Sequence, residues 1–67
     1  MTHPHELVLS FKMELERITG TRATPMAKLL SIVRLVNSYR PLLIDENVPP
    51  KEIKLFFELH RRAVNSL

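Results

Sequence analysis

The positions of its prolines and its single glycine constrain the fold of this chain more than any other feature. Gly20 is the only glycine, and the prolines are Pro4, Pro25, Pro41, Pro49 and Pro50. Proline is well tolerated in the first turn of a helix, where its missing N–H costs nothing and its fixed φ suits the helical backbone. Pro4, Pro25 and Pro50 therefore predict three helix starts, which gives helices near residues 4–19, 25–40 and 50–66.

Residues beside these starts predict how the helices begin and end. Thr24 is a suitable N-cap for the second helix, because its hydroxyl can accept a hydrogen bond from a free backbone N–H. Gly20 is expected to close the first helix in the left-handed conformation. Pro41 should end or kink the second helix near Arg40, which leaves residues 41–46 as a turn or as one more short helical piece.

The first and third helices each show one apolar face at helical spacing. In the first helix this face contains Leu7, Phe11, Leu15 and Ile18, with Val8 at its edge. In the third helix it contains Ile53, Phe56, Phe57, His60, Ala63 and Val64. No segment alternates with period two strongly enough to suggest a strand. We therefore predict an all-α fold, a small three-helix bundle in which residues 1–67 form a single helical domain.

The second helix is apolar around most of its circumference. At about 100° per residue, roughly two-thirds of the wheel is covered by Met26, Leu29, Leu30, Ile32, Val33, Leu35, Val36 and Tyr39. Only a narrow polar strip remains, formed by Ser31, Arg34 and Ser38, with Ala27 beside it. Two neighbouring helices of so short a chain leave part of this helix uncovered. We therefore expect a homodimer, in which a second copy completes the bundle.

Apolar residues also occur outside these faces. Leu9 and Met13 lie one turn apart on the polar side of the first helix, and Leu55 and Leu59 form a similar flank on the third. Together with Leu35, these residues are candidates for binding a protein partner. Two plainer interpretations stay open: the strips meet inside the core, or Leu9 and Met13 are separate surface residues of a common kind.

Every charged residue between Glu16 and Asp45 is positive. The cations from Arg22 onward are six residues apart, and six residues rotate a helix by about 240°, so this spacing spreads the charges around the helix. If the polar faces are adjacent, one basic surface for nucleic acid is formed by Arg34, Lys54, Arg61 and Arg62. The chain lacks the glycine-containing tight turn of a helix-turn-helix motif, and its net charge of +3 is modest. Nucleic-acid binding is therefore the alternative function.

Few groups suit catalysis or metal binding. His60 lies on an apolar face, where a histidine usually packs like a small aromatic ring and uses one ring nitrogen in a hydrogen bond. His3 and His5 are two residues apart, but without cysteine or a carboxylate cluster they fall short of a structural zinc site. No glycine-rich phosphate loop is present. We predict no enzymatic activity, no catalytic residue, no metal and no cofactor.

Length and composition limit the class of protein. A chain of 67 residues can form one small core but not the layered scaffolds that usually carry elaborate active sites. It has no cysteine, and no apolar run approaches the length of a membrane span. We expect a soluble, cytoplasmic regulator or inhibitor with no membrane partner, which self-associates and docks on a protein. The alternative is a transcriptional regulator that binds nucleic acid.

Overall fold

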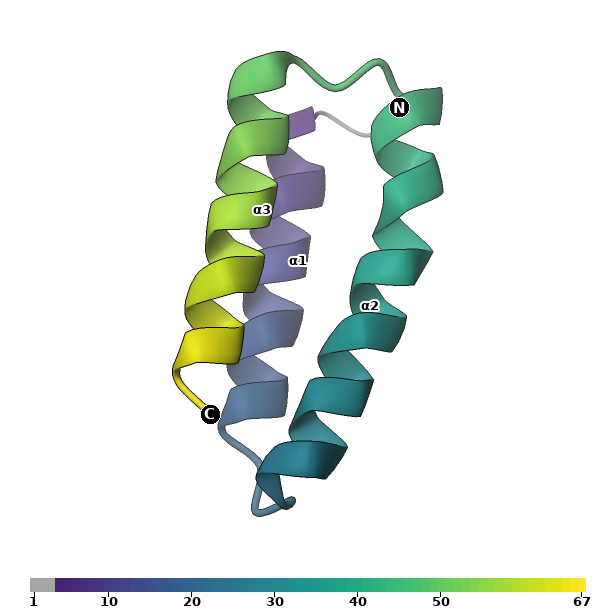
Figure 1. Cartoon of the computed structure of the whole chain (residues 1–67). Coiled ribbons are helices and arrows are strands. Elements are labelled where there is room, and N and C mark those ends of the chain that lie inside the picture. Colours follow the sequence, from purple (N-terminus) through teal and green to yellow (C-terminus); the bar gives the residue numbers. More distant parts are fainter. Residues whose placement is uncertain (1–3) are drawn as a thin grey trace.

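The fold is an antiparallel bundle of three helices. The computed structural model describes residues 4–67, which contain α1 (Pro4–Thr19), α2 (Pro25–Asp45) and α3 (Pro50–Asn65). The chain descends along α1, returns along α2 and descends again along α3 (Figure 1). Residues 4–67 include no strand, so the all-α prediction is confirmed. The first helix has its predicted bounds, and the third ends one residue earlier than predicted.

The end of α1 differs from the prediction for Gly20. Its φ is not positive, so Gly20 is not a left-handed cap. Instead the Gly20 N–H donates to the carbonyl of Glu16 at 3.0 Å, which continues the helical pattern. Thr21 then donates its N–H to the carbonyl of Ile18 at 3.3 Å. Because the backbone leaves α1 in right-handed turns, no residue with positive φ is needed there.

The start of α2 is held by two polar side chains. Thr24 is the N-cap, as predicted, and its hydroxyl accepts a hydrogen bond from the Ala27 N–H at 3.2 Å. Lys28 donates from Nζ to the carbonyl of Thr19 at 2.8 Å. This contact places a cation at the C-terminus of α1, where the helix dipole is negative. Lys28 therefore ties the end of one helix to the beginning of the next.

Of the alternatives predicted at Pro41, an end of the second helix at Arg40 is wrong, because α2 continues through Pro41 to Asp45 and residues 41–45 are helical. Pro41 has no N–H to donate to the carbonyl of Asn37, but both residues are exposed, so water can bind that carbonyl. Beyond the proline, Leu43 is buried in the core. Burial of this side chain favours the additional helical turn and offsets the lost hydrogen bond.

Among the described residues, the backbone is left-handed at Asn47 and not at the glycine. Asn47 follows the C-cap of α2 and has a φ of 50°. Its N–H donates to the carbonyl of Ile44, and the Val48 N–H donates to the carbonyl of Leu43, both at 3.2 Å. This is the Schellman pattern of helix termination. Val48 and Leu43 are both buried, so the turn is also fixed by apolar packing.

The core lies between the three helices and has an aromatic centre. Its buried residues are Leu7, Val8, Phe11, Leu15, Ile32, Val36, Leu43, Val48, Phe56 and Ala63. Phe11 of α1 and Phe56 of α3 are fully buried and stack with ring centroids 4.0 Å apart. Tyr39 of α2 lies 5.3 Å from the Phe11 ring, and its hydroxyl donates to Ser10 Oγ at 3.0 Å. One aromatic side chain from each helix therefore aligns the bundle.

Candidate interaction surfaces

One side of α2 leaves apolar side chains exposed to solvent. We term three of them the α2 surface: Met26, Leu29 and Leu30. Met26 is 75% exposed and Leu30 is 54% exposed, although both belong to the wide apolar face predicted for this helix. A single copy of the chain therefore leaves the second helix partly uncovered, as the sequence predicts. The homodimer itself stays a prediction.

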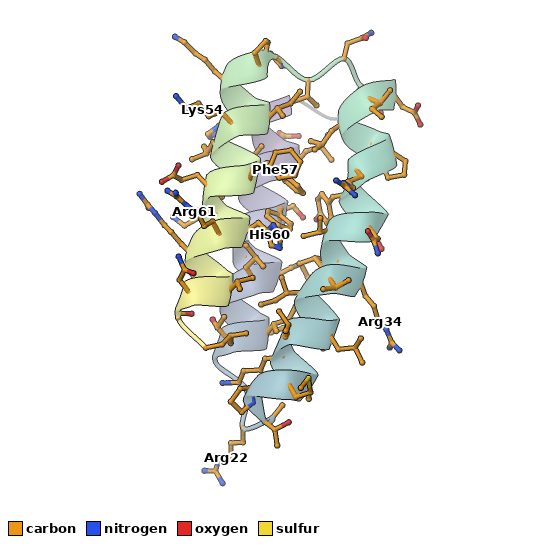
Figure 2. All side chains as sticks on the ribbon, viewed as in Figure 1. Arg22, Arg34, Lys54, Phe57, His60 and Arg61 are labelled. Atoms are coloured by element: carbon orange, nitrogen blue, oxygen red, sulfur yellow. The ribbon has the colours of Figure 1, made fainter. Side chains whose placement is uncertain are left out.

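A groove follows the boundary between α2 and α3. It is lined by Val33, Val36, Asn37, Arg40, Phe57 and His60, and we term it the α2–α3 groove. Figure 2 shows Phe57 and His60 on the side of α3 that is turned toward α2. Phe57 was predicted on the core face, yet it remains 40% exposed while its ring packs edge-on against Phe56. The groove thus has apolar walls that the bundle does not fill.

The polar groups of the α2–α3 groove have no partners within the described part of the chain. Asn37, Arg40 and His60 make no side-chain hydrogen bond or ion pair with residues 4–67. The expected hydrogen bond of His60 is therefore not found among the described residues, and this side chain is half-buried. None of the described residues that line this groove is acidic. The groove consequently offers donors to a ligand.

The predicted partner-binding residues gather only in part. Leu9, Leu55 and Leu59 line one groove between α1 and α3, together with His5, Val8, Lys12 and Arg62. Met13 is 62% exposed, one turn beyond Leu9, and does not line that groove. Leu35 departs from the prediction of a free apolar side chain, because it is half-buried and packs against the core. The strips on α1 and α3 therefore meet at the surface, without Leu35.

The predicted basic residues do not form one surface. In Figure 2, Arg34 lies on the side of α2 that faces away from α3, whereas Lys54 and Arg61 project from the opposite side of the bundle. The guanidinium of Arg61 is 3.0 Å from Glu58 Oε1, and that of Arg62 is 3.7 Å from the same oxygen. The structure thus separates Arg34 from the other cations and gives two of them an acidic neighbour.

The histidines near the start of the chain provide no metal site within the described residues. His3 lies outside the described residues, and His5 Nδ1 is 3.7 Å from Glu52 Oε1. Residues 4–67 contain no group of three or more histidine and acidic side chains suited to a metal ion.

None of the helices described combines the length and the apolar content needed to cross a membrane.

The sequence prediction missed the α2–α3 groove. Its signal is visible in hindsight, because Val33, Asn37 and Arg40 follow one another at spacings of four and three residues on one side of α2. Phe57 and His60 have the same three-residue spacing on α3. The pattern within a single helix does not determine which sides of two helices face each other.

The chain matches no protein-family model, no curated protein and no solved structure.

Proposed function

We propose that this chain is a cytoplasmic, non-enzymatic helical interaction protein, a small regulator or inhibitor that self-associates through α2 and docks on a protein partner. The observation that carries the proposal is the α2 surface. Contiguous exposed apolar side chains mark interaction sites when they adjoin one another on one face. Met26 lies three residues before Leu29 and four before Leu30, so these three side chains adjoin.

The arrangement of surfaces supports two contacts. The α2 surface suits a second copy, because two such faces can bury each other around a twofold axis. The groove with Leu9, Leu55 and Leu59 lies between α1 and α3 and remains accessible in such a dimer. Met13, beside Leu9, extends this second surface. This groove is therefore available to a helical segment of a partner protein.

A charge placed within the α2 surface tests self-association. We expect the natural chain to sediment as a dimer at micromolar concentrations and Leu30→Lys to sediment as a monomer, because burying an unpaired ammonium in an apolar contact is costly. Ser31→Lys is the matched control. Ser31 is the next residue of α2 and is exposed on the polar strip, so this variant adds the same charge outside the surface.

Sedimentation and circular dichroism distinguish the outcomes of this experiment. Equal helical content in both variants, with dissociation only in Leu30→Lys, supports self-association through α2. A natural chain that remains monomeric throughout the concentration range contradicts it. Equal dissociation of both variants shows that added charge, and not the α2 surface, controls association.

A further inference from the structure

The α2–α3 groove combines apolar walls with polar side chains that have no partner among residues 4–67. Val33, Val36 and Phe57 provide the apolar contacts. Asn37 and Arg40 lie three residues apart on α2, and His60 approaches the same groove from α3. A groove with mostly apolar lining and a few converging polar groups has the composition of a ligand-binding site.

The charge of this groove defines the ligand. Arg40 has no ion pair within residues 4–67, and the described lining residues include no carboxylate. The next acidic residue along α2 is Asp45, which lies five residues after Arg40 and does not line the groove. A guanidinium presents several donors in one plane and matches a carboxylate in a bidentate contact, and the Asn37 amide can add a donor beside it. The complementary ligand therefore carries a carboxylate next to an apolar group.

The exposure of the groove distinguishes a protein segment from a small molecule. Small-molecule sites usually enclose most of the ligand surface. Here Phe57 and Val33 remain 40% and 44% exposed. An open groove of this kind suits an extended occupant, such as an amphipathic peptide or helix.

We propose that the α2–α3 groove binds an acidic amphipathic segment of a partner protein. Arg40 and Asn37 hold a carboxylate of this segment. Val33 and Phe57 contact an apolar side chain one turn away from that carboxylate. The inference rests on the proposed function, because it names the chemistry of the protein partner.

The probe for this proposal is a short synthetic amphipathic peptide with alternating clusters of Leu and Glu, labelled with fluorescein. Its matched control replaces every Glu by Gln. Fluorescence anisotropy with the full chain should show that the Gln peptide binds about tenfold more weakly, since hydrogen bonds to charged groups are the stronger ones. Amide chemical shifts should change most around Val33, Asn37, Arg40 and Phe57.

Arg40 and Arg34 form a matched pair of variants. Both are exposed cations of α2 without an ion pair among the described residues, but only Arg40 lines the groove. We expect Arg40→Gln to weaken binding of the Glu peptide about tenfold and Arg34→Gln by less than about twofold. Arg40→Lys should fall between these results, because it keeps the charge but loses the planar pair of donors. Circular dichroism of each variant verifies that the fold is retained.

Several results would overturn the proposal. Equal weakening by Arg40→Gln and Arg34→Gln means nonspecific attraction to a basic surface. Equal affinity for the Glu and Gln peptides means that no carboxylate is recognised. Shift changes confined to the groove between α1 and α3 place the peptide elsewhere, and absence of binding at low salt removes the site altogether.

The same variants separate this inference from self-association. Leu30 does not line the α2–α3 groove, so Leu30→Lys should bind the Glu peptide as tightly as Ser31→Lys. A monomeric natural chain that shows binding dependent on Arg40 contradicts self-association and supports the groove. A dimeric chain that fails to bind the peptide contradicts the groove and supports self-association.

Discussion

Helices α2 and α3 differ in the ion pairs that their arginines form and in the number of apolar side chains that they expose. On α3, Glu58 neighbours Arg61 and Arg62, and Phe56 is fully buried. On α2, Arg34 and Arg40 have no ion pair with any described residue. The same helix exposes Met26, Leu29, Leu30, Val33, Leu42 and Ile44. The two arginines at the end of α3 therefore have an acidic neighbour within their own helix, whereas Arg34 and Arg40 of α2 have none among the described residues.

This difference separates what stabilises the bundle from what is available to a partner. A cation that is already paired gives up a contact when it binds a new ligand, whereas an unpaired one does not. Exposed apolar area likewise contributes nothing to the stability of the single bundle until it is covered. By both criteria α2 is the helix that has most to gain from an additional contact.

The largest expected effect on stability concerns the core contact made by α3. Phe56→Ala should cost about 3–5 kcal/mol of the free energy of unfolding, because it removes a fully buried ring stacked on Phe11. A core of this size supplies about that amount, so the variant should be largely unfolded. Phe57→Ala, one residue further on, should cost only about 1 kcal/mol, since its ring is partly exposed.

Urea denaturation followed by far-ultraviolet circular dichroism measures both variants. Similar losses for Phe56→Ala and Phe57→Ala would show that the second ring belongs to the core. The groove wall would then be structural, and its availability to a partner would be in doubt.

A smaller effect is expected on α2, where Pro41 interrupts the hydrogen bonds of a continuous helix. Pro41→Ala should raise the free energy of unfolding by about 1–2 kcal/mol, because alanine restores the bond to the Asn37 carbonyl and suits a helix interior. Part of the gain is lost, since proline also restricts the unfolded chain. Pro50→Ala, at the first position of α3, is the control and should change stability by less than about 0.5 kcal/mol.

Thermal and urea denaturation of these two proline variants test whether burial of the Leu43 side chain keeps α2 helical beyond Pro41. A destabilised Pro41→Ala would mean that the native backbone around residue 41 is not one that alanine accepts. In that case the proline would determine the backbone conformation of α2 around residue 41.

The smallest expected effect concerns the charges that distinguish the two helices. Glu58→Gln should cost only about 0.5 kcal/mol, because surface ion pairs within one helix are weak. Arg40→Gln should leave the free energy of unfolding unchanged, since Arg40 has no such neighbour among residues 4–67. Denaturation at low and high salt measures both, and salt should reduce only the effect at Glu58. An equal loss at Arg40 would reveal a stabilising contact and contradict the contrast between the helices.

Much of the fold could be predicted because its signals are local. Proline at a first helical turn and Thr24 as an N-cap act through neighbouring backbone atoms, so their effects do not depend on the rest of the chain. Pro41 is different, because its cost depends on whether the Asn37 carbonyl reaches water. The left-handed conformation predicted at Gly20 occurs at Asn47 instead for a similar reason, since the path of each turn decides where a positive φ is needed.

The surfaces could be predicted less completely, because they depend on how helices are rotated relative to one another. Spacing within one helix correctly places Leu9 beside Met13 and Leu55 beside Leu59. It does not determine that Arg34 faces away from α3, or that Arg40 and Phe57 lie on one groove. These relations arise from packing around the aromatic centre of the core, which only the tertiary structure defines.

The position of Tyr39 has a practical consequence. The chain contains this single tyrosine and no tryptophan, so its ultraviolet fluorescence is dominated by one side chain. That side chain lies where α2 meets α1, with its hydroxyl on Ser10 and its ring beside Phe11. The unlabelled natural protein therefore carries its own optical reporter at the junction of these helices, and separation of α2 from α1 can be followed without introducing a dye or a substitution.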